Sequence, residues 1–159
     1  MVLAVNPGTR YLGLAVFYGN YLKDWRTKAL KGPWSKEKLN NTLSIVSAWI
    51  DRYEPEILVV KKLHPSRSSK SLDTLAGKVE QRGLKDGLTV RRYSIKELEA
   101  FLCQDAPKNK RNLAEAVAAR YPELYLELMT ERARKNPYHI RMFEAVALGA
   151  MCSSELDNN

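Results

Sequence analysis

Lysine and arginine, whose side chains could bind phosphate groups, outnumber the acidic residues of the sequence. The chain carries 26 of these residues against 18 aspartates and glutamates, which gives a net charge of +8 at pH 7. Nine of these cations are candidates for contact with phosphate: five between positions 61 and 78, three between 108 and 111, and one near the N-terminus. The residues concerned are Arg10, Lys61, Lys62, Arg67, Lys70, Lys78, Lys108, Lys110 and Arg111. Such a basic protein suits a polyanion, because each phosphate that it neutralises releases a condensed counterion. An ordinary solvated surface rich in lysine is the alternative interpretation.

Histidine and cysteine, two common catalytic residues, are scarce in this sequence. His64 and His139 are the only histidines in the sequence. No partner that would orient either ring as a base is evident, so we expect structural roles for both. Cys103 and Cys152 have the spacing of neither a disulfide framework nor a metal site. We expect them to be reduced, helical and buried in a cytoplasmic protein.

The N-terminal part of the chain predicts three strands. The apolar run at residues 2–5 indicates a strand buried on both faces, and Pro7-Gly8 then indicates a turn. Residues 11–18 and 21–28 are rich in β-forming residues and are joined by Gly19-Asn20. These two segments therefore predict a β-hairpin.

The rest of the chain alternates between helical and strand patterns. Apolar spacing predicts a helix capped by Ser35 and extending to Tyr53, followed by a second buried strand at residues 57–60. A helix between two such strands is typical of a parallel sheet. Beyond it, the patterns predict a loop at 64–70, a helix at 71–82 and a strand at 88–93. A capping box at Ser94–Glu97 predicts a helix that extends to Cys103. A loop at 105–110 and helices around 113–121 and 140–151 complete the predicted elements.

This order of elements predicts an α/β fold. Three hairpin-type strands followed by strand–helix alternation favour a mixed five-stranded sheet flanked by helices. Residues 1–152 are predicted to form one domain, with a polar, frayed tail at 153–159. No apolar run approaches the roughly 18 residues that a membrane-spanning helix needs, so we expect no membrane partner.

Four segments, in order along the chain, resemble the motifs of one enzyme family. Residues 2–13, VLAVNPGTRYLG, resemble a first strand with the pattern apolar run-D-P-G-[ST]-R-x-x-G. Residues 55–62, PEILVVKK, resemble a fourth strand that ends in a glutamate, and residues 110–113, KRNL, resemble a basic helix start. Residues 141–147, RMFEAVA, resemble a last helix with the pattern D-x-x-D-A-x-A. The chain thus resembles the RNase H-like superfamily, and within it the RuvC-type Holliday-junction resolvases of DNA recombination and repair. The resemblance implies an RNase H-like fold.

The resemblance also identifies a site. In the active family, acidic side chains from the first strand, the fourth strand and the last helix hold two Mg²⁺ or Mn²⁺ ions, which activate water and stabilise the leaving oxygen. The matching positions here hold Asn6, Lys61, Arg141 and Glu144. One amide, two cations and one carboxylate give a charge of +1 where the family has −4. Hard cations need several oxygen ligands and are repelled by the lysine and arginine.

The resemblance therefore predicts a pseudo-active site without a metal cofactor. Glu144 is the one strong ligand left, and either Lys61 or Arg141 could neutralise it. The same residues also have plainer interpretations. Asn6 could satisfy hydrogen bonds of the turn, Arg141 and Glu144 could form an exposed helix pair, and Lys61 could be a solvated strand end.

Three functions follow from these interpretations. The first is a catalytically inactive protein that binds branched or duplex DNA, or structured RNA, mainly through the nucleic-acid backbone. The nine basic residues named above would then border the cleft where active relatives meet DNA. The second is an active Holliday-junction or structure-specific endonuclease, in which Asp24, Asp73 or Glu80 joins Glu144 in a rearranged Mg²⁺ or Mn²⁺ site.

The third function is a protein-interaction module that has kept the fold and lost contact with nucleic acid. Its partner surface could include Trp25, Trp34 and Trp49, although tryptophans more often belong to a core or its rim. A homodimer is implied by the family alone.

Overall fold

Five strands form one mixed sheet in the computed structural model, which describes residues 1–158. The strands are β1 (Val2–Asn6), β2 (Tyr11–Tyr18), β3 (Tyr21–Ala29), β4 (Ile57–Lys61) and β5 (Thr89–Tyr93). Their order in the sheet is β3-β2-β1-β4-β5. Strand β2 pairs antiparallel with both β3 and β1, and β4 pairs parallel with both β1 and β5. The predicted mixed five-stranded sheet is therefore confirmed.

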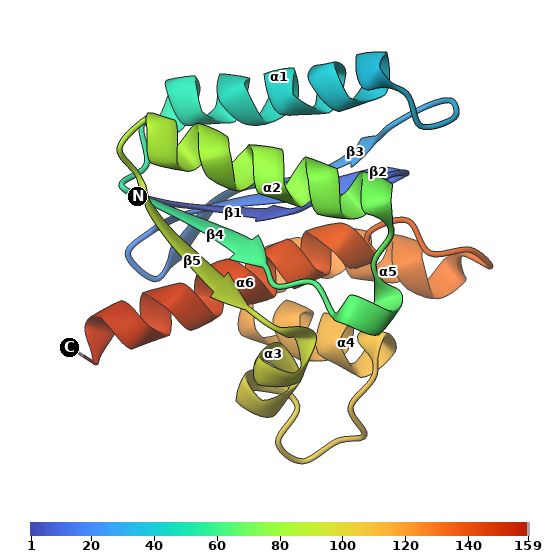
Figure 1. Cartoon of the computed structure of the whole chain (residues 1–159). Helices are drawn as coiled ribbons and strands as arrows, with labels where there is room; N and C mark the ends of the chain where they lie inside the picture. The colour runs from blue at the N-terminus through green and yellow to red at the C-terminus, as the bar shows by residue number, and fades with distance from the viewer. Residues whose placement is uncertain (159) are drawn as a thin grey trace.

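Helices cover both faces of this sheet (Figure 1). They are α1 (Lys36–Tyr53), α2 (Lys70–Lys85), α3 (Ile95–Leu102), α4 (Lys110–Arg120), α5 (Tyr125–Ala133) and α6 (Ile140–Asp157). Helices α1 and α2 lie on one face, and α6 crosses the other face with α3 and α4 packed beneath it. Short 3₁₀ turns at Pro65–Arg67 and Pro122–Leu124 precede α2 and α5.

The core consists of two apolar layers, because alternate residues of each strand point to opposite faces of the sheet. Leu3 and Val5 of β1 belong to the layer under α1 and α2. Val2 and Ala4 of the same strand belong to the layer under α6 and α4. Strand β1 is buried throughout, as its continuous apolar run predicts.

Several predicted helix starts are confirmed by their caps. The Ser35 hydroxyl accepts a hydrogen bond from the backbone N–H of Lys38 at 3.1 Å, and Ser94 and Glu97 form the predicted capping box. Helix α2 begins at Lys70 with Ser69 as its cap, slightly before the predicted start, and extends three residues beyond Arg82.

Two predictions about the C-terminal half are wrong. Helix α5 was not expected, and residues 153–157, expected as a frayed tail, continue helix α6; residue 159 lies outside the described residues. Glu155 in this last part finds partners on β5, because its carboxylate accepts a hydrogen bond from the Tyr93 hydroxyl and lies 3.5 Å from the Arg91 guanidinium. Ser153 is buried, and its hydroxyl forms no hydrogen bond within the described residues.

The cysteines and tryptophans occupy the interior. Both cysteines are free and buried, Cys152 within α6 and Cys103 at the C-cap of α3, and burial raises the pKa of each thiol. Trp49 is buried, whereas Trp25 and Trp34 are partly buried and pack against the two core layers. None of the helices within residues 1–158 is both long and apolar enough to cross a membrane.

Candidate functional site

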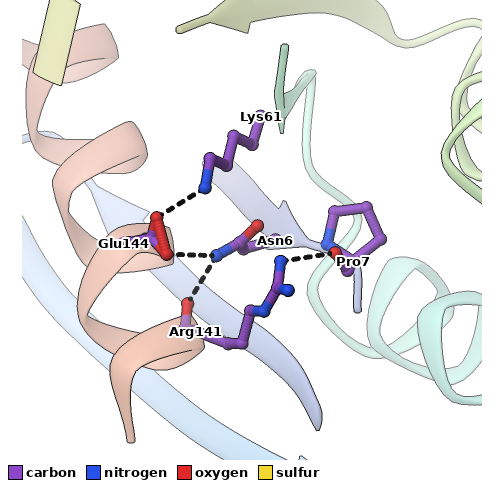
Figure 2. Close-up of polar contacts among 5 residues, drawn as sticks. All are labelled: Asn6, Pro7, Lys61, Arg141 and Glu144. Carbon is purple, nitrogen blue, oxygen red and sulfur yellow. Dashed lines mark hydrogen bonds and ion pairs between the residues drawn. The ribbon is translucent and has the colours of Figure 1, made fainter. Parts of the chain in front are cut away.

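Two parallel strands and the last helix bring the four predicted site residues together. Val5 of β1 is in register with Val60 of β4, so the residues that follow them, Asn6 and Lys61, reach the same edge of the sheet. Helix α6 packs across β1 and β2, and its first turns carry Arg141 and Glu144 to this edge. Figure 2 shows all four residues at this point.

A glycine on β2 allows α6 to approach so closely. Gly13 lies opposite Asn6 in the antiparallel pairing of β1 and β2. A Cβ atom on Gly13 would lie 2.0 Å from the carbonyl oxygen of Arg141, a distance that no side chain can occupy. The bare backbone at this position therefore sets the depth at which the first turn of α6 lies on the sheet.

A buried carboxylate is the centre of the site. The Lys61 ammonium donates a hydrogen bond to Oε2 of Glu144 at 2.7 Å, forming an ion pair. The Asn6 amide Nδ2 donates to Oε1 of Glu144 at 3.4 Å and to the Arg141 carbonyl at 3.2 Å. The side chain of Glu144 is 2% exposed and that of Lys61 is 15% exposed. The carboxylate is thus compensated by one cation and one amide, as a buried charge requires.

Arg141 points away from this carboxylate. Its Nη1 donates a hydrogen bond to the carbonyl oxygen of Pro7 at 3.1 Å, as Figure 2 shows. Its guanidinium lies against the turn, where a Cβ on Gly8 would be 3.0 Å from the arginine Nε. Lys61, rather than Arg141, therefore neutralises Glu144.

The residues at this edge do not fit a two-metal centre. Glu144 is the only carboxylate of the four, and both of its oxygens already accept hydrogen bonds from Lys61 and Asn6. The Oδ1 atom of buried Asn6 lacks a hydrogen-bond partner, but a single amide oxygen cannot replace several carboxylates as a ligand set. Across residues 1–158, no three histidine, cysteine, aspartate or glutamate side chains come together in a way that could hold a metal ion.

The acids considered for a rearranged site are engaged or lie elsewhere. Asp24 on β3 accepts a hydrogen bond from the Tyr53 hydroxyl. Glu80 on α2 forms an ion pair with Arg92 at 2.6 Å. Asp73 lies exposed in the first turn of α2. Within the described residues, no hydrogen bond joins any of these three acids to Glu144, whose partners are Lys61 and Asn6.

Comparison with solved structures gives matches over the whole chain. RuvC of Thermus thermophilus in complex with a Holliday junction substrate matches with a TM-score of 0.72 and 19% identity, over 99% of this chain and 95% of that chain. Another structure of Thermus thermophilus RuvC matches with a TM-score of 0.69 and 17% identity, over 99% and 96% of the two chains. The Fowlpox virus resolvase in complex with Holliday junction DNA matches with a TM-score of 0.62 and 12% identity, over 98% and 99%.

This chain has the RNase H-like fold of the RuvC-type resolvases. The fold expected from the four sequence motifs is therefore confirmed. No protein-family model and no curated protein sequence matches the chain. The likeness is one of structure, because sequence identity to these resolvases is below 20%.

Two adjoining hollows on the surface, close to the site formed by Asn6, Lys61, Arg141 and Glu144, are lined by several basic residues. One, of about 220 Å³, is lined by Arg10, Lys110 and Arg141. The other, of about 260 Å³, is lined by Lys110 and Arg111 and by further cations that precede α6. Lys110, Pro137 and Ile140 line both hollows, so the two adjoin one another; the second also contains Glu115 and Glu131. Of the nine basic residues predicted to bind nucleic acid, the structure brings Arg10, Lys110 and Arg111 together here.

The other predicted basic residues lie on separate elements. Lys62 and Arg67 are in the connection after β4, Lys70 and Lys78 are on α2, and Lys108 precedes α4. Lys61 points inward to Glu144 and is mostly buried, so it is occupied by the ion pair.

Sequence reasoning missed the cations that precede α6. Arg132, Arg134 and Lys135 line the second hollow together with Glu115 and Glu131. The sequence shows a charged stretch at residues 131–135. The position of this stretch beside Lys110 depends on how helix α5 packs, and the sequence patterns did not predict α5.

Both histidines have structural contacts, as expected. His64 accepts a hydrogen bond from the backbone N–H of Ser66 at 3.1 Å and so caps a 3₁₀ turn. His139 shares a 2.8 Å hydrogen bond with the Thr27 hydroxyl. Burial lowers the pKa of His139, and the negative charge of Glu131 acts in the opposite direction. Neither ring contacts Glu144 or Asn6.

Proposed function

We propose that this chain is a non-catalytic nucleic-acid-binding protein in which an ion pair takes the place of a metal centre. The observation that carries the proposal is the 2.7 Å contact between Lys61 and Glu144. It occupies the edge of the sheet where the resemblance to the RuvC-type resolvases implies metal-binding carboxylates. Cleavage of a phosphodiester by two metal ions needs an anionic cage, and this site carries an excess of positive charge.

Binding of nucleic acid is supported by cations near this site that are not paired with carboxylates. The chain has a net charge of +8. Within the described residues, Arg10, Lys110 and Arg141 form no ion pair with a carboxylate, whereas Arg82, Arg92 and Arg132 each do. Cations that are free of carboxylates are available to phosphates. Two of the similar structures are complexes with Holliday junction DNA, which makes branched DNA the first substrate to test.

Salt-titrated binding tests the proposal. Fluorescence anisotropy would compare a four-way junction, a duplex and a single strand of DNA, and a structured RNA, at several salt concentrations. We expect binding that weakens linearly on a plot of log affinity against log salt, because phosphate contacts release counterions. Absence of binding to every probe at low salt would refute the proposal.

A cleavage assay tests the alternative function of an active endonuclease. The protein is incubated with labelled junction DNA and either Mg²⁺ or Mn²⁺ at high protein concentration. We expect no cleavage products. Metal-dependent cuts that disappear in the Glu144→Gln variant would show that the chain is an enzyme and would contradict the non-catalytic part of the proposal.

A further inference from the structure

The hollow bordered by Arg10, Lys110 and Arg141 also has aromatic walls. Tyr11 at the start of β2 and Tyr138 before α6 line it together with the three cations. Their rings meet edge to face, with centroids 5.2 Å apart and planes inclined at 69°. Among the described residues, no carboxylate side chain lines this hollow. It therefore combines uncompensated positive charge with flat apolar surface.

The two rings are held in place by their neighbours. The Tyr138 ring makes a second edge-to-face contact with His139, with centroids 4.7 Å apart. The Arg134 guanidinium covers one face of the Tyr138 ring, 4.8 Å from the ring centre, so a base would meet the other face or the ring edge. Both tyrosines are half-buried. Because rigid aromatic surfaces lose little conformational entropy on binding, such rings are well suited to recognise a planar ligand.

The hollow is lined by three cations that can bind an anion. Arg141 is fixed by its hydrogen bond to the Pro7 carbonyl, and this contact uses only one of its donors. Lys110 lies in the first turn of α4, and Arg10 lies in the turn after β1. Guanidinium and ammonium groups at these places can bind the oxygens of a phosphate. A planar apolar group and a phosphate occur together in a nucleotide.

We propose that this hollow binds a single unpaired nucleotide, with its phosphate on Arg10, Lys110 and Arg141 and its base against Tyr11 and Tyr138. The inference rests on the proposed nucleic-acid binding and makes it specific. A paired duplex presents only its backbone to such a hollow, because its bases are stacked inside the helix. An unpaired nucleotide can enter with its base and add stacking to the phosphate contacts. The protein therefore selects nucleic acids that carry an unpaired nucleotide, such as bulges or open branch points.

The test compares three DNA probes of equal length with the unmodified protein. One is a perfect duplex, one carries a single unpaired thymidine, and one carries an abasic analogue at the unpaired position. We expect the unpaired thymidine to bind more tightly than the abasic analogue by about 5- to 150-fold, the range for one stacked base. Equal affinity for thymidine and abasic probes would overturn this inference and leave nucleic-acid binding intact. Absence of binding to all three probes, and to the junction and RNA, would instead refute the proposed function itself.

Variants locate the effect. Tyr138→Leu keeps an apolar side chain but removes the flat ring, so we expect it to abolish the preference for thymidine over the abasic analogue while binding to the duplex persists. Tyr11→Leu should act in the same direction. Tyr125→Leu is the matched control, because Tyr125 is 58% exposed on α5 and does not line the hollow. A preference that survives in both Tyr138→Leu and Tyr11→Leu, each shown to be folded by circular dichroism, would place the base elsewhere and overturn the assignment.

Discussion

The Lys61 ammonium lies 2.7 Å from the Glu144 carboxylate and joins the end of β4 to the second turn of α6. The two residues are 83 positions apart in sequence, so the contact ties together distant parts of the chain. Glu144 is almost fully buried, and breaking a buried ion pair by removing one partner is strongly destabilising. The pair lies at the place where the resemblance to the RuvC-type resolvases implies metal-binding carboxylates.

Removal of the lysine charge should destabilise the fold. In Lys61→Met, the carboxylate of Glu144 loses its cation while it stays buried. We expect a loss of about 3 kcal/mol in the free energy of unfolding, at the lower end of the range for a broken buried pair because part of Lys61 is exposed. Urea denaturation followed by tryptophan fluorescence measures the change.

The double variant Lys61→Met/Glu144→Gln is the control. It removes both charges, so no unpaired buried ion remains, and we expect it to recover most of the lost stability. If the double variant is as unstable as Lys61→Met, the loss comes from the packing of the lysine stem rather than from its charge.

Restoring the carboxylates should create metal binding. The variant Asn6→Asp/Lys61→Glu/Arg141→Asp places four carboxylates at the edge where the natural chain has one. We expect this variant to melt below the natural protein without metal, because the charges repel one another. Millimolar Mn²⁺ should raise its melting temperature, since a ligand that binds only the folded state at 100 times its Kd contributes about 2.7 kcal/mol.

The natural protein under the same conditions is the comparison. We expect its melting temperature to change little with Mn²⁺, because its site has a net positive charge. An equal rise in both proteins would mean that Mn²⁺ binds elsewhere and that the four positions do not determine metal affinity.

Local patterns predicted most of the fold. The continuous apolar run of β1, the hairpin turn and the capping box at Ser94 are local signals, and each is confirmed.

Helix α5 was not predicted because its apolar residues do not form one buried face. Only Leu128 of α5 is buried, whereas Leu126 and Met129 are exposed. The end of α6 was missed because Glu155 finds its partners, Tyr93 and Arg91, on β5, which no local pattern can show.

The candidate site was predictable in its membership but not in its connections. The motifs placed Asn6, Lys61, Arg141 and Glu144 at one site. They left open whether Lys61 or Arg141 neutralises the carboxylate. That choice depends on the rotation and depth of α6 on the sheet, which are set by long-range packing on Gly13. The same packing directs Arg141 toward Pro7.

The close approach of α6 at Gly13 makes this glycine sensitive to substitution. A Cβ there meets the Arg141 backbone at 2.0 Å, and backbone atoms cannot move aside as a flexible side chain can. We expect Gly13→Ala to lose about 3 kcal/mol or more of stability in urea denaturation. Gly77→Ala is the matched control, because its Cβ has no neighbour within 4 Å and lies inside helix α2. It should gain about 0.5–1 kcal/mol. A Gly13→Ala protein as stable as the natural one would contradict the observed packing.

His139 should make the free energy of unfolding decrease at mildly acidic pH. Burial lowers the pKa of His139 below its ordinary value of 6.5. Between pH 6.5 and the lowered pKa, the unfolded chain binds more protons than the folded one, so the free energy of unfolding falls as the pH falls. His139→Gln removes this titration and keeps a group that can hydrogen-bond Thr27. Thermal melts from pH 7.5 to 5.0 should therefore show a smaller decrease for His139→Gln than for the natural protein. Parallel pH profiles would mean that His139 does not contribute.

The salt dependence of nucleic-acid binding should identify which cations contact phosphate. Arg10→Gln and Lys110→Gln each remove one charge from the hollow beside Arg141, and neither leaves a carboxylate unpaired among the described residues. We expect each substitution to weaken binding to all probes and to reduce the slope of log affinity against log salt by about 1, the value for one lost phosphate contact.

Arg92→Gln is the control, because it lowers the net charge by the same amount but removes a cation already paired with Glu80 at 2.6 Å. If net charge alone governs binding, all three variants should weaken it equally. If the hollow is the contact surface, Arg92→Gln should leave the slope unchanged, and anisotropy titrations at four salt concentrations separate these two outcomes.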